Sequence, residues 1–185
     1  MVIEKATDVR KEWSYFCDKV TREKPVFIKR TRDKIWMSDL DILQDILEIY
    51  SFNASRYTET DGSITLSSDE LDLVENGTTE EDAKLKMGAA IFEYAEDYYG
   101  EFELYSRAPN RKAHIPYIIK ALIIGDGDKI GRPELFGQQE VQGEHRRPHL
   151  VVGVVGRQLV EGHDDLRARL RGNRVEEAPV RRADL

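Results

Sequence analysis

Hydrophobic residues at the start of the chain switch from helical spacing to strand-like runs. Residues 8–22 carry apolar side chains three or four positions apart, and Thr7 or Asp8 can accept hydrogen bonds from the first free backbone amides, so a helix is predicted there. The apolar face of this helix consists of Val9, Trp13, Phe16, Cys17 and Val20. Residues 25–30 and 34–37 are β-rich runs on either side of a short turn-like segment, which predicts a β-hairpin.

An apolar helix is expected to follow the hairpin. Ser38 is a suitable start for it, with Asp41 three positions later, and leucine and isoleucine side chains continue to about Ile49. A short first strand is expected at residues 2–3. The elements of residues 1–50 therefore read β-α-β-β-α.

A second set of elements is predicted within residues 51–130. Residues 51–60 are polar and read as a connection, residues 61–62 form an Asp-Gly turn, and short strands are expected at 64–66 and 71–74. These strands lead into a second, smaller α+β unit.

A long helix is predicted after these strands. Thr78 and Glu81 have the spacing of a capping box, in which each side chain bonds to the other residue's backbone amide. The predicted apolar face consists of Ala83, Met87, Ala90, Ile91, Tyr94, Ala95 and Tyr98. The fold class is therefore α+β, with an N-terminal β-α-β-β-α unit, a small α+β unit and a poorly structured tail.

The pattern fades after residue 130, where the composition also changes. All 11 lysines lie in residues 1–130, whereas 10 of the 17 arginines lie in 131–185, where Phe136 is the one aromatic residue and 159–170 the one helix-like run. A stretch with so few aromatic residues is not expected to build its own core. Three explanations stay open: a disordered tail, a fused fragment, or translation in a shifted reading frame, which the replacement of lysine by arginine favours.

Charge and cysteine content narrow the possible functions. The formal charge of -7 argues against attraction of the whole protein to nucleic acid or to a membrane, and the single Cys17 favours a reducing cytoplasm. No apolar run is long enough to span a bilayer. His114 is the one histidine before the tail, and no Cys/His or carboxylate spacing matches a metal site. We therefore expect no enzymatic activity, no cofactor and no metal.

Basic residues are concentrated near the N-terminus. Residues 1–37 hold ten Lys and Arg against six Asp and Glu. A solvated hairpin is the simplest interpretation, but a homodimer would place two such patches on one surface and allow them to bind DNA phosphates. The DNA-binding residues predicted in this way are Arg10, Lys11, Lys29, Arg30, Arg32 and Lys34.

Four motifs follow one another in an order found in a known family. They are VRKEWS (9–14), PVFIKR (25–30), IWMS (35–38) and LDIL (40–43). In this order, residues 1–50 resemble the prevent-host-death (Phd/YefM) antitoxins of type II toxin–antitoxin systems. The resemblance implies a dimer that binds operator DNA of its own operon, with phosphate contacts from Arg10, Arg30 and Arg32. Many members have Gly or Asn-Gly in the hairpin where this chain has Thr31-Arg32-Asp33.

The second half also carries motifs of a known kind. They are LDLVENGTTEE (71–81), FEYAEDY (92–98) and YSRAPNRK (105–112), followed by His114 and by Pro116 with Tyr117. They resemble the longer second half of some antitoxins paired with RelE-like toxins, and the strand–helix part is also similar to the HicB-type antitoxin unit. A toxin that cleaves messenger RNA presents a basic surface, which an acidic segment can cover. The predicted toxin-binding residues are Asp69, Asp72, Glu80, Glu81, Glu93, Glu96 and Asp97.

The combined hypothesis is an antitoxin that neutralises a RelE-like ribonuclease toxin and, as a dimer, binds operator DNA to repress its own operon. The alternative is a DNA-binding repressor with a ligand- or protein-binding second domain and no toxin partner. A third hypothesis is a small enzyme that uses His114, Arg111 and nearby carboxylates.

Overall fold

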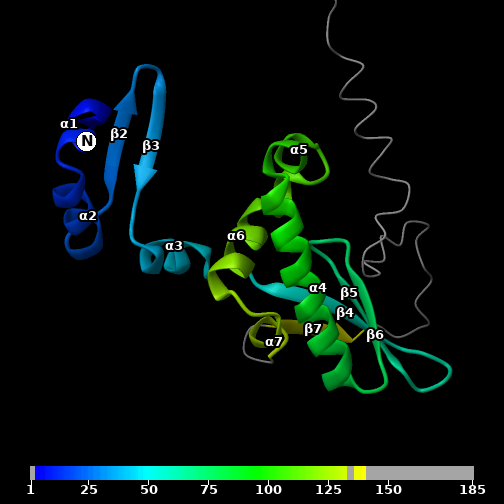
Figure 1. Cartoon of the computed structure of the whole chain (residues 1–185). Coiled ribbons are helices and arrows are strands. Elements are labelled where there is room, and N and C mark those ends of the chain that lie inside the picture. Colours follow the sequence, from blue (N-terminus) through cyan, green and yellow to red (C-terminus); the bar gives the residue numbers. More distant parts are fainter. Residues whose placement is uncertain (1–2, 133–135, 141–185) are drawn as a thin grey trace, which may run out of the picture. The chain divides into compact units, whose positions relative to one another are not determined.

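The computed structural model describes residues 3–132 and 136–140, and it has the predicted α+β fold (Figure 1). The described residues form two separate sheets, one of three strands and one of four. No helix within the described ranges is long and apolar enough to cross a membrane. The helix-like run at 159–170 lies outside the described residues.

The first sheet has the strand order β1-β2-β3 and is covered on one side by two helices (Figure 1). Its elements are β1 (Glu4–Lys5), α1 (Ala6–Lys11), α2 (Trp13–Arg22), β2 (Val26–Arg30) and β3 (Asp33–Met37). The predicted hairpin is confirmed, with β2 and β3 antiparallel and Thr31 in the left-handed region at φ 54°. The first strand lies two residues later than expected and pairs in parallel with β2.

The single helix predicted over residues 8–22 is wrong. The backbone leaves the helical region at Glu12 (φ -116°, ψ 39°), which separates α1 from α2. This break turns Trp13 out of the apolar face, so that the residue is 58% exposed. Helix α1 also has no side-chain cap from Thr7 or Asp8, because it begins at Ala6 after Lys5.

A small core lies between the helices and the first sheet. It consists of the buried residues Val9, Phe16, Val20, Val26 and Ile28, with Ala6 and Met37 packed against them. The next helix, α3 (Leu40–Leu47), does not contribute to it but contacts a helix of the second half. Its cap is Asp39 rather than Ser38, because Asp39 Oδ1 accepts from the amide of Asp41 at 2.9 Å.

The second sheet has the order β6-β5-β4-β7. Its strands are β4 (Phe52–Thr58), β5 (Ile64–Ser68), β6 (Val74–Gly77) and β7 (Phe136–Glu140). The connection predicted over residues 51–60 is therefore largely a strand, in which Phe52 and Ala54 face the core. Strand β7 pairs in parallel with β4, and Phe136 is buried, so the sheet continues beyond the change of composition at residue 130.

Helix α4 (Glu80–Gly100) packs along one face of the second sheet (Figure 1). All seven residues predicted for its apolar face are buried. The predicted cap is displaced by one position, because Thr79 accepts from the amide of Asp82 at 3.1 Å while the Asp82 carboxylate accepts from the amide of Thr78 at 2.9 Å.

Short helices complete the large core around α4. They are α5 (Phe102–Arg107), a 3₁₀ turn (Lys112–His114), α6 (Ile115–Ile124) and α7 (Gly127–Ile130). Helix α7 crosses α4 where Gly88 faces Gly127 and Gly131, so closely that a side chain on Gly88 would overlap the backbone of both. The largest fully buried side chains of this core include Tyr98, Phe52, Leu66 and Ile118.

Candidate nucleic-acid and protein interfaces

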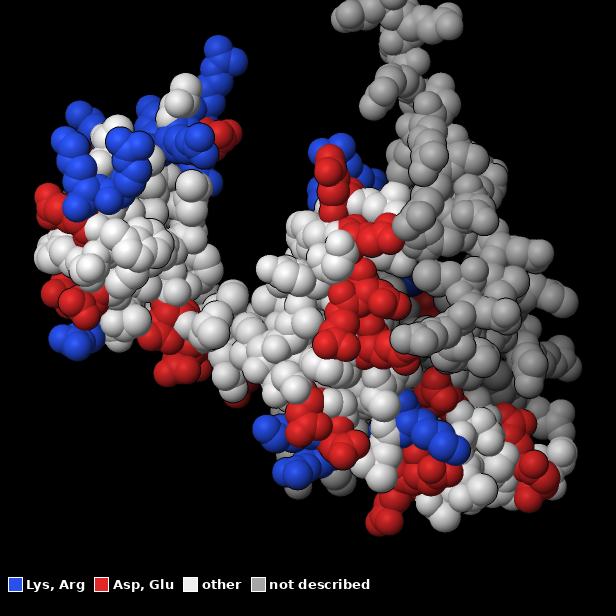
Figure 2. All heavy atoms as spheres, in the orientation of Figure 1, with Lys and Arg blue, Asp and Glu red and all other residues white. Residues whose placement is uncertain are grey.

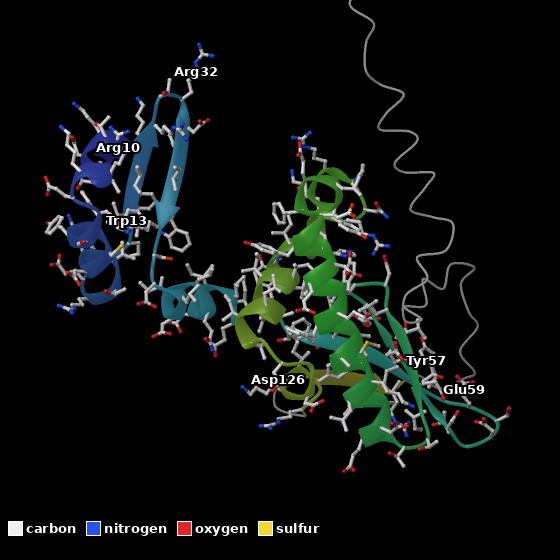
Figure 3. All side chains as sticks on the ribbon, viewed as in Figure 1. Arg10, Trp13, Arg32, Tyr57, Glu59 and Asp126 are labelled. Carbon is white, nitrogen blue, oxygen red and sulfur yellow. The ribbon has the colours of Figure 1, made fainter. Side chains whose placement is uncertain are left out.

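The predicted DNA-binding residues gather around α1 and the hairpin turn. All six are exposed, and within the described residues none of them forms a salt bridge. Figure 2 shows Lys and Arg concentrated at this end of the first sheet and its helices. Figure 3 shows Arg32 projecting from the tip of the hairpin and Arg10 on the outside of α1. This end is therefore a cationic surface whose six predicted residues form no salt bridge in the part of the chain that the structure describes, although Asp33 lies opposite Arg30 across the two strands.

The sheet divides the six basic residues into two groups. Arg30 is on the side that α1 and α2 cover, because it alternates with Lys29 and follows the buried Ile28. Lys29 lies opposite Lys34 on the other side, and Lys5 is level with Lys29 on the neighbouring strand. Like charges in direct cross-strand register destabilise a sheet. Three lysines thus form a row on the open face of the sheet, and folding alone does not account for them.

The predicted toxin-binding residues do not form one surface. Glu93, Glu96 and Asp97 lie on the exposed side of α4, within one turn of the helix. Half-buried Glu75 on β6 is close to Glu93, and its pKa is raised mainly by burial, with Glu93 adding to the shift and Lys86 opposing it. Figure 2 shows Asp and Glu gathered along α4. We call Glu93, Glu96 and Asp97 the acidic stripe.

The other predicted acidic residues have different surroundings. Glu80 binds Arg56 at 3.2 Å and Lys84 at 2.8 Å, and Asp69 accepts from the Ser55 hydroxyl at 3.2 Å. Asp72 is exposed in the β5–β6 connection at φ 56°, and Glu81 is exposed in the first turn of α4. Glu80 and Asp69 therefore already serve contacts within the fold.

Exposed apolar side chains were not predicted as part of any interface. Phe27 and Trp36 face each other across β2 and β3 on the open face of the first sheet and are 42% and 39% exposed. Ile46 and Ile49 at the end of α3 are 51% and 81% exposed. The sequence does carry a signal for the second pair, since the apolar side of α3 is broad, but such a pattern is equally typical of a helix that packs against a core.

The residues of the enzyme hypothesis form a buried polar cluster. His114 is 4% exposed, and its Nδ1 lies 2.9 Å from the hydroxyl of Tyr94, to which Arg111 Nη1 donates at 3.2 Å. The hydroxyl of Tyr98 donates to the carbonyl of Arg111 at 3.0 Å. Within the described ranges, no group of three His, Cys, Asp or Glu residues is arranged to hold a metal ion. Through these contacts, two tyrosines of α4 hold the 3₁₀ turn and the residue before it against the core.

Comparison with known proteins identifies the family of this chain. A family model described as "PHD_like: Antitoxin of toxin-antitoxin, RelE / RelB, TA system" matches residues 1–132. The chain belongs to this antitoxin family. Its match runs from the basic end of the first sheet through the acidic stripe of α4 to the end of α7.

A solved structure is also similar to this antitoxin. It is an antitoxin part of a proposed toxin/antitoxin system from Syntrophomonas wolfei subsp. wolfei, with 35% sequence identity and a TM-score of 0.71. The similarity covers 76% of this chain and all of that one. No curated protein matches the sequence. As an antitoxin, the chain has a toxin as its partner.

Proposed function

We propose that this antitoxin is a homodimer in the cytoplasm, whose N-terminal region, residues 1–50, binds operator DNA and represses its own operon. Residues 51–130 then bind and neutralise a RelE-like ribonuclease toxin. The observation that carries this proposal is the separation of charge: the unpaired cations lie around α1 and the hairpin turn, and the acidic stripe lies on α4. Two surfaces of opposite charge suit two partners of opposite charge.

The size of the small core supports a dimer. Five buried side chains hold α1, α2 and the first sheet together, and folded units of fewer than about 40 residues usually need a disulfide, a metal or oligomerisation. Large apolar side chains are left exposed on the same elements, namely Ile3, Trp13, Tyr15, Phe27, Ile35 and Trp36. A second copy would bury such residues and stabilise both small cores.

The geometry of the basic residues supports DNA binding by Arg10, Lys11, Arg30 and Arg32. They lie at the hairpin tip and on the helix-covered side of the sheet, where a dimer would present them twice. Cations on a surface without carboxylate partners bind phosphates and release condensed counterions. Binding is therefore expected to weaken steeply as the salt concentration rises.

The acidic stripe supports binding of a basic toxin. Like charges three and four residues apart destabilise a helix, so Glu93, Glu96 and Asp97 oppose the folding of α4 in the free protein. A ribonuclease that grips RNA phosphates carries a complementary basic surface. Covering that surface would exclude RNA, which neutralises the toxin without any chemistry.

Co-expression with the protein encoded next to the antitoxin gene tests the toxin assignment. We expect the neighbouring product alone to stop growth and cleave messenger RNA, and the full-length chain to restore growth and co-purify with it. A neighbouring product that leaves RNA intact would contradict the RelE-like assignment.

DNA binding is tested separately, by fluorescence anisotropy of a labelled promoter fragment from the same operon. Equal affinity for that fragment and for an unrelated DNA of the same length would contradict operator recognition.

A further inference from the structure

Helix α4 carries large apolar side chains on its outer side as well as on its buried side. The buried side packs against β5, β6, α6 and α7. On the outer side, Leu85 is 48% exposed and Tyr99 is 62% exposed, and Phe92 between them is half-buried. The three residues are seven positions apart, which is close to two helical turns, so they lie nearly in one line along α4. We call Leu85, Phe92 and Tyr99 the apolar strip.

The apolar strip has the length and spacing of a surface on which a second helix packs. At a rise of about 1.5 Å per residue it is about 21 Å long, which matches about four turns of a partner helix. A seven-residue repeat of apolar side chains is the pattern of helix-on-helix packing. Ala89 lies one turn from both Leu85 and Phe92 and is exposed, so a partner backbone can approach closely there. Phe102, whose ring centroid is 6.3 Å from that of Tyr99, extends the strip beyond the end of α4.

Carboxylates border the apolar strip along the second half of α4. Glu96 lies one turn from both Phe92 and Tyr99, and Glu93 and Asp97 flank it. Residues 91–100 contain these three carboxylates and no Lys or Arg. The C-terminal end of a helix already has a negative potential from its backbone dipoles, so acidic side chains there oppose folding. A partner that complements this side of α4 is therefore both apolar and basic.

The acidic border disfavours two other occupants of the strip. In a second copy of the chain, a facing α4 would bring its own acidic stripe against these carboxylates, and such like charges repel. A nucleic acid would bring phosphates, which are also negative. A basic amphipathic helix places opposite charges against the stripe.

We propose that a basic amphipathic helix of the toxin packs along the outer side of α4. Its apolar side covers Leu85, Ala89, Phe92 and Tyr99, and its Lys and Arg side chains lie against the acidic stripe. Tyr99 is the anchor of this contact, because exposed aromatic side chains that become buried on binding carry a large share of the affinity. The charges select a basic partner and speed its association. This inference rests on the proposed toxin binding by residues 51–130 and assigns a helix as the element of the toxin that binds there.

Truncation of one exposed ring tests the apolar contact. The full-length chain is titrated by isothermal calorimetry with the purified protein encoded next to its gene, and we expect Tyr99→Ala to raise the dissociation constant at least tenfold. Tyr15→Ala on α2 is the matched control, because Tyr15 is 52% exposed and its ring also meets a Phe ring edge to face. We expect this control to change the constant less than threefold. Equal effects of the two substitutions would overturn the proposal, whereas a wild-type chain that does not bind this protein would refute the proposed function itself.

Salt separates the contribution of the apolar strip from that of the acidic stripe. Exposed charges are screened at high ionic strength, whereas an apolar contact is not. The loss of affinity caused by Tyr99→Ala is therefore expected to be the same in about 0.1 M and about 0.5 M salt. A loss that disappears at the higher salt concentration would overturn the assignment of the strip as an apolar contact.

Thiol protection tests the position of the partner directly. In a Cys17→Ser background, single cysteines replace Leu85, Ala89 or Tyr99, and Thr60→Cys in the exposed β4–β5 turn is the control. We expect the purified toxin to slow alkylation at the three α4 positions at least fivefold and to leave the control unchanged, as measured by mass spectrometry of the antitoxin. Protection of the control alone, or equal protection of all four positions, would overturn the proposal. Protection of the α4 positions by the antitoxin's own concentration, without toxin, would assign the strip to a second copy instead.

Discussion

The hydroxyl of Tyr94 lies 2.9 Å from Nδ1 of His114 inside the large core. This hydroxyl accepts from Arg111 and keeps its own hydrogen, which it can donate to Nδ1 of a neutral imidazole. The surroundings of His114 favour this neutral form. Burial lowers its pKa, the charge of Arg111 lowers it further, and Asp72 opposes both. Burial also raises the pKa of Tyr94 to about 12, which keeps the hydroxyl protonated.

Acid is expected to destabilise the fold through this pair. In the unfolded chain His114 takes up a proton near pH 6.5, whereas the folded chain resists protonation, so the contribution to stability is complete above pH 6.5 and is lost as the pH falls below it. His114→Asn keeps an acceptor for Tyr94 but does not titrate. At pH 7.5 we expect the free energy of unfolding of this variant to be about 1–3 kcal/mol lower than that of the wild type, because the smaller side chain leaves a cavity.

Urea unfolding at pH 7.5, 6.5 and 5.5, at one protein concentration, measures this effect. The gap in free energy of unfolding between the wild type and the His114→Asn variant is expected to narrow as the pH falls. A gap that stays constant over this range would show that His114 is not held neutral by the core.

Gly88 is predicted to tolerate no side chain. A Cβ atom there would lie 2.3 Å from the carbonyl oxygen of Gly127 and 2.5 Å from the amide nitrogen of Gly131, so α7 would have to move away from α4. Gly88→Ala should therefore lower the free energy of unfolding by about 1–3 kcal/mol. Gly100→Ala at the end of the same helix is the control, because nothing lies within 4 Å of its Cβ position. We expect it to unfold at the same urea concentration as the wild type or a slightly higher one.

The parts of the fold that were predictable from sequence are those whose pattern is local. The apolar face of α4 is confirmed because a 21-residue helix repeats its period several times. Strand β4 was missed because one of its sides, with Asn53 and Ser55, carries polar residues that look like a connection. Strand β7 was missed because its partner, β4, lies some eighty residues away along the chain, and pairing at that distance leaves no local pattern.

The candidate interfaces were predictable in composition but not in arrangement. The concentration of basic residues is visible in the sequence, yet the division between Arg30 and Lys29 depends on which face of β2 the helices cover. Phe27 and Trp36 look like core residues in any strand pattern. Their exposure follows from the single layer of helices on the first sheet, which is a property of tertiary packing.

Removing a basic residue at the hairpin end is expected to weaken binding to DNA of any sequence. Arg10→Ala and Arg32→Ala should each reduce the slope of log affinity against log salt by about 0.9 for every phosphate that is no longer neutralised, and by about twice that in a dimer. Lys24→Ala is the control. Lys24 is an exposed cation just before the first residue of β2, and the hairpin turn is at the other end of that strand. Fluorescence anisotropy at several salt concentrations measures the slopes. Unchanged slopes for both arginine variants would remove these residues from the DNA interface.

The acidic stripe is expected to affect stability and toxin binding in opposite directions. Replacing Glu93, Glu96 and Asp97 together by Ala removes repulsion along α4 and introduces the best helix former, so the isolated antitoxin should unfold at an equal or higher urea concentration. Affinity for the toxin should fall at least tenfold, because the complementary charge is removed.

Isothermal titration calorimetry with the purified toxin measures that affinity, and Asp128→Ala on α7 is the control for loss of an exposed acidic side chain elsewhere. A triple variant that binds the toxin as tightly as the control would place the toxin on another surface, since its fold is intact by the unfolding measurement. Loss of both stability and affinity would instead mean that these carboxylates hold α4 in place, which their exposure and mutual repulsion argue against.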